Sequence, residues 1–266
     1  MKLTSIASGS SGNCIFVSSK ECRLLVDTGI SGKRIEQGLL SLGEHASDLD
    51  GILITHEHID HINGLGVMMR KYHLPVFATS GTIDCILQTG KLGKMDRSLF
   101  YAVTPDQPFQ IKDLVIDPSS TWHDAKDPVC YSFYQDNIKA SVATDLGNFD
   151  DYLVEKLAES DILFVEANHD IKMLEVGRYP YPLKQRILGS KGHLSNERSG
   201  QLISRLMNDK LKQIFLGHLS KDNNYPELAY ETVKLELTLH NIDLKERNIH
   251  MEVAKRDTLS TLCQVS

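Results

Sequence analysis

Three apolar segments of this 266-residue chain each end at a residue that can bind a metal ion. The segments are "DGILITH", "IKASVATD" and "KQIFLGH", and they end at His56, Asp145 and His218. Short apolar runs of this kind are typical of buried strands, and each is followed by residues with helical spacing. Alternating strands and helices predict an α/β fold with polar side chains at one edge of a sheet, where such folds place ligands.

The same patterns predict the other elements. Strands are expected at "KLTSIA", "CIFVSS", "CRLLVD", "DILFVEAN" and "NIHMEVAK", and helices at 150–160, 195–207 and 226–240. With 41% hydrophobic and 24% charged residues, the chain can bury an ordinary globular core. It contains no linker-like tract, charge block or repeat, so residues 1–266 are predicted to form a single domain without an inserted one.

The stretch "THEHIDHINGLG" places four potential metal ligands close together: His56, His58, Asp60 and His61. Imidazoles and a carboxylate so close to one another favour a bound cation, and these donors suit zinc or manganese. In a tight loop, His56 and His58 can face one ion while Asp60 and His61 face a second.

Each ion needs further ligands from elsewhere in the chain. His123 in "TWHDAKDP", Asp145 and His218 are the candidates at expected strand ends, and His123 is preferred to the adjacent Asp124. Asp145 is the candidate able to bridge two ions, because a carboxylate has two oxygen atoms.

Composition narrows the class of protein. The five cysteines form no C-x-x-C pair, which argues against a disulfide framework and a cysteine zinc site. No signal-peptide core and no apolar run near the ~18 residues of a membrane span is present, so a cytoplasmic protein without membrane contact is expected. With a net charge of −6, a nucleic-acid partner would require a local basic surface.

The order H-x-H-x-D-H, a later H, D before L-G, and a final H resembles the metallo-β-lactamase fold superfamily. That resemblance implies an αββα sandwich of two mixed sheets flanked by helices. "LVDTG" at 25–29 is similar to the superfamily's first motif, in which Asp27 would orient the metal loop without binding metal.

More narrowly, "SGSSGNC", "HDAKDPVCYSF", "TDLG", "EANHD" and "HLSKDNN" resemble the bacterial YycJ/WalJ group. This resemblance implies a metal-dependent 5′-to-3′ exonuclease acting on double-stranded DNA. The chain differs from other branches of the superfamily. It lacks the cysteine ligand of the secreted β-lactamases. The spacing of its motifs leaves no room for the glycine-rich arm of the tRNA-processing enzymes or for the inserted domain of the β-CASP nucleases.

Two divalent ions, zinc by default with manganese or iron possible, would generate a bridging hydroxide that attacks phosphorus. Asp60 and Asp145 would hold this hydroxide, and His193 in "SKGHLSN" is the candidate proton donor to the leaving oxygen. Ser195 and Asn196 would bind phosphate at a helix N-terminus.

Two segments are candidates for binding the polymer. Ser10 and Asn13 of the turn "SGSSGN" would receive a 5′-phosphate, although a plain tight hairpin explains this turn equally well. The basic stretch 178–191, with Lys184 and Arg186, would follow a nucleic-acid backbone, and a solvated surface is the alternative.

Two other functions stay open at this point. One is a hydrolase of small thioesters or lactones, and the other is a non-catalytic metal-binding module. The sequence does not select the physiological metal, the choice of DNA or RNA, the oligomeric state or any protein partner.

Overall fold

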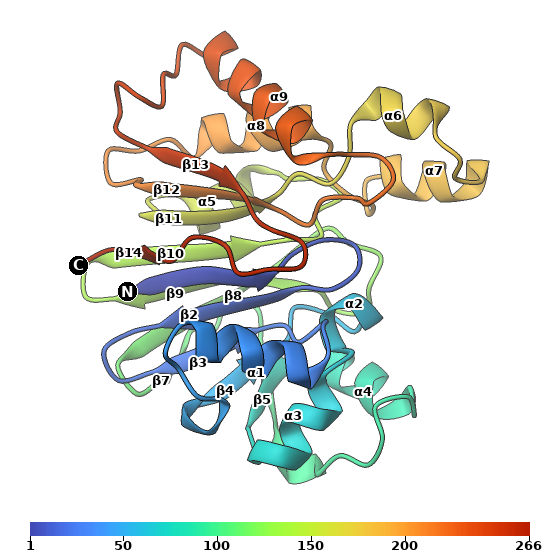
Figure 1. The fold of residues 1–266 in the computed structure, drawn as a ribbon, viewed down its shortest axis with the longest axis vertical. Helices are drawn as coiled ribbons and strands as arrows, with labels where there is room; N and C mark the ends of the chain where they lie inside the picture. The colour runs from blue at the N-terminus through green and yellow to red at the C-terminus, as the bar shows by residue number, and fades with distance from the viewer.

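Two seven-stranded β-sheets stack face to face in the computed structural model, which describes all 266 residues (Figure 1). The first sheet has the strand order β14 (Cys263–Gln264), β1 (Lys2–Ala7), β2 (Cys14–Ser18), β3 (Arg23–Val26), β4 (Gly51–Leu53), β5 (Val76–Thr79) and β6 (Phe100–Val103). The second has the order β13 (His250–Val253), β12 (Gln213–Gly217), β11 (Ile162–Glu166), β10 (Ile138–Ala143), β9 (Val129–Gln135), β8 (Leu114–Ser120) and β7 (Phe109–Ile111).

Helices cover the outer face of each sheet. The first sheet carries α1 (Gly32–Ser41), α3 (Leu65–Tyr72) and α4 (Ser80–Gln88), and the second carries α5 (Asp151–Leu157), α8 (Asn196–Arg205) and α9 (Pro226–Leu239). Short 3-10 turns lie at η1 (Ala46–Asp48) and η2 (Arg97–Leu99). This architecture confirms the expected αββα sandwich, and no helix has the length and apolar character needed to cross a membrane.

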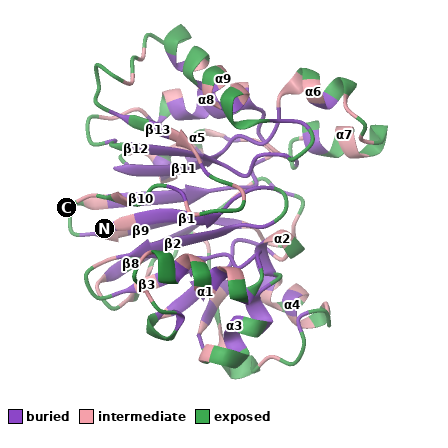
Figure 2. Cartoon of the chain, viewed as in Figure 1, coloured by how far each residue is buried: buried purple, intermediate pink, exposed green.

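Period-two alternation along the strands builds three hydrophobic layers, because successive side chains point to opposite faces of a sheet. On β11, Phe164 points between the sheets, whereas Leu163 and Val165 pack under α5, α8 and α9. β2 behaves in the same way in the other sheet, with Ile15 between the sheets and Phe16 facing the helices. The central strands are therefore buried on both faces, as Figure 2 shows.

One edge of the sandwich gathers the carboxyl ends of strands from both sheets. β3 and β4 are parallel in the first sheet, and β10, β11 and β12 are parallel in the second. The loops that follow these strands meet at the right-hand edge in Figure 1, beside α2 (Ile59–Ile62). The chain termini lie at the opposite edge, where the Met1 amino group donates to the Val265 carbonyl over 2.6 Å.

Most expected elements are confirmed, with differences near the ligand loop. The strand expected over 50–56 ends at Leu53, because the Thr55 N–H donates to the Asp27 carboxylate instead of to a neighbouring strand. The helical pattern that follows is divided between α2 and α3. Two helices were not expected, α6 (Ile171–Val176) just before the basic stretch and α7 (Tyr181–Leu188) within it, and both project from the body beside the same edge (Figure 1).

Phe164 is a test of the inter-sheet core, since its fully buried ring stacks 6.0 Å from that of Phe215. Phe164→Ala should lower the free energy of unfolding by about 3–5 kcal/mol, because it leaves a cavity between two sheets that cannot collapse freely. Urea denaturation followed by circular dichroism measures the loss. Leu235→Ala on α9, where the side chain is 59% exposed, should cost far less, and equal losses for the two variants would contradict this account of the core.

Candidate metal centre

The loop after β4 is held in place by the carboxylate of Asp27, the first residue beyond β3. This carboxylate accepts the Thr55 N–H (2.9 Å), the Thr55 hydroxyl (2.9 Å) and the Nδ1–H of His61 (2.7 Å). Three donors on one buried carboxylate satisfy its acceptor atoms and fix its orientation. Because Nδ1 of His61 is committed to Asp27, its Nε2 is the atom that faces the centre of the cluster.

Three residues of the site stand just beyond strand ends in the left-handed backbone region. They are Asp27 after β3, Asp145 after β10 and His218 after β12, with φ angles of 62°, 58° and 55°. Such angles cost a residue with a Cβ about 1–3 kcal/mol and persist only where the surroundings enforce them. The turn that they produce ends the strand and directs each side chain into the space between the two sheets' edges.

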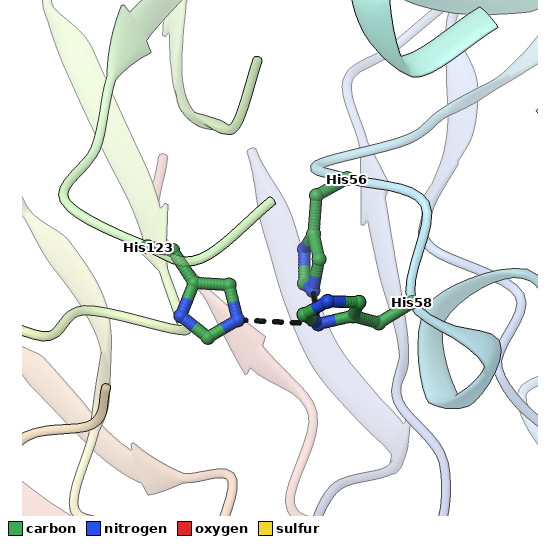
Figure 3. Close-up of side chains that lie close together, drawn as sticks. All are labelled: His56, His58 and His123. Atoms are coloured by element: carbon green, nitrogen blue, oxygen red, sulfur yellow. Dashed lines mark hydrogen bonds between the residues drawn. The ribbon is translucent and has the colours of Figure 1, made fainter. Parts of the chain in front are cut away.

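Three imidazoles form the first group of possible ligands, His56, His58 and His123 (Figure 3). Nδ1 of His58 lies 3.0 Å from Nε2 of His56 and 3.2 Å from Nε2 of His123. Nδ1 of His123 lies 3.0 Å from the carbonyl of Gly192, which can only accept a hydrogen bond, so this nitrogen carries the proton and Nε2 keeps a lone pair.

The contact between His56 and Thr55 shows in the same way which nitrogen of His56 carries a proton. The Thr55 hydroxyl donates its proton to Asp27, so it accepts from Nδ1 of His56 at 3.0 Å. That arrangement leaves Nε2 of His56 unprotonated and directed at the group.

Asp60, His61 and His218 form the second group. Oδ2 of Asp60 lies 3.6 Å from Nε2 of His61 and 3.7 Å from Nε2 of His218. The two rings stack with their centroids 5.4 Å apart. The single-turn helix α2 positions Asp60 and His61, whereas His218 comes from the end of β12.

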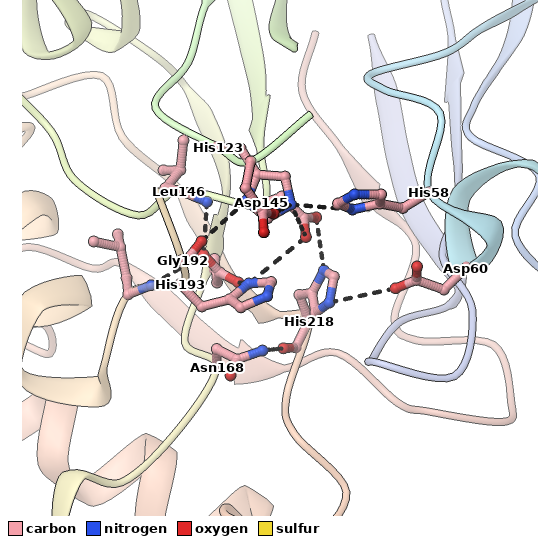
Figure 4. Close-up of polar contacts among 12 residues, drawn as sticks. His58, Asp60, His123, Asp145, Leu146, Asn168, Gly192, His193 and His218 are labelled. Carbon is pink, nitrogen blue, oxygen red and sulfur yellow. Dashed lines mark hydrogen bonds and ion pairs between the residues drawn. The ribbon is translucent and has the colours of Figure 1, made fainter. Parts of the chain in front are cut away.

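Asp145 stands between the two groups (Figure 4). Its Oδ2 lies 2.8 Å from Nδ1 of His218 and 3.1 Å from Nε2 of His61, while its Oδ1 lies 3.6 Å from Nε2 of His123. The structure thus brings together all seven residues that the sequence analysis predicted as metal ligands.

The donor set fits a divalent cation. Oδ2 of Asp145 and Nδ1 of His218 are both buried and make no hydrogen bond, although only 2.8 Å separates them. Buried polar atoms without partners are costly, whereas two lone pairs converging on one ion are satisfied together. Imidazole and carboxylate donors are those that zinc, manganese and iron accept.

Burial and mutual charge perturb the titration of these groups. Burial lowers the pKa of His56 well below its ordinary value, and burial also lowers that of His123. Burial opposes the charge on His61 too, but the Asp145 and Asp27 carboxylates outweigh it and raise the pKa of His61 well above the ordinary value.

The carboxylates respond in the opposite direction. Burial alone would raise the pKa of Asp60, yet His61 and His218 lower it to about 2. His218 and His61 likewise hold the pKa of Asp145 well below its usual value against the effect of burial. The carboxylates therefore stay ionised at neutral pH, ready to bind a cation.

His193, the predicted proton donor, reaches the edge of the same cluster (Figure 4). Its Nδ1 lies 2.6 Å from Oε1 of Glu166 and 3.6 Å from Oδ1 of Asp145. Burial acts against its charge, but the Glu166 carboxylate raises the pKa of His193 to about 9. The imidazole is accordingly protonated at neutral pH.

Glu166 and Thr55 are two contributors that the sequence analysis missed. Oε2 of Glu166 accepts the N–H groups of Leu146 and Leu194, and its side chain is fully buried at the end of β11. A glutamate closing an otherwise apolar strand, in "DILFVEAN", was the available signal, because buried carboxylates need partners.

The structure revises two of the predicted substrate contacts. Asn13 is buried, and its amide bonds to the Gly9 N–H and lies 3.2 Å from Nε2 of His61. Asn196 is fully buried and exchanges hydrogen bonds with Asn224. Both amides therefore support loops from within instead of facing a substrate.

The other predicted contacts lie around the edge of the site. Ser10 is exposed, and Ser195 is a buried N-cap that accepts the Arg198 N–H at the start of α8. Nζ of Lys184 donates to the Glu175 carbonyl within the α6–α7 region. Arg186 pairs with Asp124, next to His123 in the chain, which ties α7 to the loop that carries this ligand.

An αββα sandwich with histidine and aspartate ligands at one edge defines the metallo-β-lactamase class of metal-dependent hydrolases. The model of the β-lactamase superfamily domain matches residues 22–218, and the chain belongs to this superfamily.

Within the superfamily, the chain belongs to the WalJ/YycJ group. It is 40% identical to exodeoxyribonuclease WalJ of Streptococcus pneumoniae serotype 2 (strain D39 / NCTC 7466) over 236 residues, which cover 89% of this chain and 88% of that protein. It is 39% identical to exodeoxyribonuclease YycJ of Bacillus anthracis, with 86% of each chain covered. Among solved structures, Zn(2+)-bound PqqB from Methylobacterium extorquens shares the fold over 100% of both chains, with a TM-score of 0.72 and 15% identity.

Asp27→Asn tests how far the metal loop depends on this carboxylate. The amide NH₂ cannot accept from His61, so the ring is expected to turn or to protonate Nε2, and metal affinity should fall about 10–100-fold. Competition with a chromogenic chelator measures the affinity. Asp257→Asn, at a side chain 70% exposed, is the matched control. Unchanged affinity in Asp27→Asn would contradict the positioning role.

Metal removal should lower the melting temperature. A ligand that binds only the folded state stabilises it by about 4 kcal/mol at a thousandfold excess over Kd. Differential scanning calorimetry with and without a chelator measures the shift, and added zinc or manganese should restore it. The melting temperature of Asp145→Asn should change less on addition of the chelator than that of the natural chain. An identical melting temperature of the natural chain with and without chelator would refute metal binding by the folded state.

Proposed function

We propose that the protein is a metal-dependent exonuclease that hydrolyses phosphodiester bonds from the 5′ end of double-stranded DNA. The observation that carries the proposal is the position of His193, whose Nδ1 lies 2.6 Å from Glu166 and 3.6 Å from Asp145 at the edge of the metal-ligand cluster. The exodeoxyribonuclease names of the two relatives, each alike over most of the chain, supply the substrate class. Neither the small-ester hydrolase nor the non-catalytic module is favoured by a specific contact.

Two ions would be held by the two ligand groups. His56, His58 and His123 would hold one and Asp60, His61 and His218 would hold the other, while Asp145, which stands between the two groups, would be a ligand to both. When bound, such ions supply Lewis acidity toward phosphate and a water molecule activated near neutral pH.

The chain's own groups would complete the reaction. The ionised Asp60 and Asp145 are placed to orient the attacking water, because their oxygens face the space shared by the ligands. His193 would donate its proton to the leaving sugar oxygen, a transfer for which a positioned imidazolium is suited. Glu166 would keep this ring oriented, since its other oxygen is fixed by two backbone N–H groups.

The basic α6–α7 region would receive the DNA backbone. Residues 171–191 contain five basic side chains and one acidic one, in a chain whose net charge is −6. Lys172, Arg178 and Lys191 are exposed and make no ion pair, so they are free to contact phosphates, whereas Lys184 and Arg186 already bond within the protein. Phosphate contacts of this kind position a nucleic acid without reading its sequence.

A duplex with labelled 5′-phosphorylated ends, incubated with the zinc- or manganese-loaded protein, tests the activity and its direction. Nucleotides should be lost stepwise from the 5′ end. His193→Gln should lower kcat about 10²–10⁴-fold, because it removes the proton donor, while the bound metal measured by atomic absorption stays unchanged.

His240→Gln, at an exposed histidine that ends α9, is the matched control and should keep full activity. Full activity in His193→Gln would eliminate the proposed proton transfer. Intact DNA with the metal-loaded natural chain would eliminate the nuclease itself.

A further inference from the structure

The loop between β8 and β9, residues 121–128, carries the chain's single tryptophan beside the ligand His123. The Trp122 side chain is 44% exposed, which is unusual for the largest apolar side chain. Its indole N–H donates to Asp150 over 3.2 Å, and its carbonyl accepts the Gly147 N–H over 2.7 Å. The ring is therefore held in one position while much of its surface faces solvent.

A cavity of about 440 Å³ opens beside this ring, and we call it the Trp122 pocket. Trp122, His123, Lys126, Tyr152 and Lys191 are among the residues that line it. Its volume lies within the range of about 300–1,000 Å³ typical of small-ligand sites.

The Trp122 pocket adjoins the metal centre through His123. His123 belongs to the wall, and its Nδ1 donates to the carbonyl of Gly192 over 3.0 Å. In the chain, Gly192 stands between Lys191, which is also in the wall, and His193, and Figure 4 draws Gly192, His193 and His123 together. A ligand in the pocket would thus adjoin the candidate metal ligand His123 and the loop that leads to His193.

The charged groups in the wall leave two cations available. Lys126 and Lys191 make no ion pair and no side-chain hydrogen bond. Of the two acidic residues in the wall, Asp150 already accepts the Trp122 indole N–H and the Leu153 N–H, and Asp127 adds one further carboxylate.

We propose that the Trp122 pocket binds the base of a nucleotide next to the scissile phosphate, stacked on the indole. The inference rests on the proposed nuclease function and adds a substrate subsite to it. Every base has a flat π-face, so stacking on an aromatic ring holds DNA without sequence preference. The fixed ring loses little freedom on binding, which favours affinity, and the two lysines of the wall supply positive charge for the neighbouring phosphates.

Because Trp122 is the chain's single tryptophan, its fluorescence reports on this pocket alone. Titration of the metal-loaded protein with a short phosphorothioate oligothymidylate, which resists cleavage, should quench the emission to a plateau. The anisotropy of the same oligonucleotide carrying a terminal dye gives total binding independently. The two titrations should give the same Kd.

Three variants separate stacking from structure. Trp122→Ala should raise KM for DNA about tenfold, the effect expected for loss of one stacked base, with kcat little changed. Trp122→Phe keeps an aromatic face and should stay near the natural chain. Tyr101→Ala, at a tyrosine 50% exposed on the edge strand β6, is the control and should leave KM unchanged.

Binding seen by anisotropy without a change in emission, together with an unchanged KM in Trp122→Ala, would overturn the subsite and leave the nuclease standing. Absence of both DNA binding and DNA degradation in the natural chain would overturn the proposed function, and the subsite with it.

Discussion

The metal centre depends on the bonds that the buried Asp27 carboxylate makes to Thr55 and His61. The loops after β1 and β3 are hydrogen-bonded to the turn that carries Asp60 and His61. The Asn13 N–H donates to the Asp60 carbonyl, and the Thr28 N–H donates to the His61 carbonyl. Gly29 lies so close to this turn that an added Cβ would stand 1.6 Å from the Asp60 carbonyl oxygen. Only glycine permits that approach, and the ligand loop is thereby clamped between the turn after β1 and the turn after β3.

This arrangement brings several carboxylates close together. Without a metal ion, protons on the histidines are the only positive charge that balances them. Asp27, Asp60 and Asp145 face His61 from three sides, and its raised pKa together with the lowered pKa values of Asp60 and Asp145 follow from that crowding. A divalent cation replaces those protons with a charge held by fixed ligands. The same crowding therefore explains both the unusual titration and the affinity for a metal.

The second sheet contributes the groups proposed to act on the substrate. Glu166 ends β11 and holds His193, while the carbonyl of Gly192 receives Nδ1 of His123. This contact joins the loop with the metal ligand to the loop with the proposed proton donor. The Trp122 pocket opens at that junction, so the position of a bound base would be coupled to the position of the reacting groups.

Apolar runs in the sequence by themselves predicted eight of the fourteen strands, and histidine and aspartate residues after them marked the seven candidate ligands. The αββα class followed from the resemblance of these motifs to a known superfamily and is confirmed by the two stacked sheets. The sequence did not reveal that Glu166 would pair with His193 or that Asn13 would serve the ligand loop, since these contacts join segments far apart in the chain. Nor did it reveal the left-handed turns at Asp27, Asp145 and His218, which depend on bonds made only after the sheets have stacked. Tertiary structure decided those features because the two sheets must meet before a buried carboxylate finds its donors or a loop closes beside Trp122.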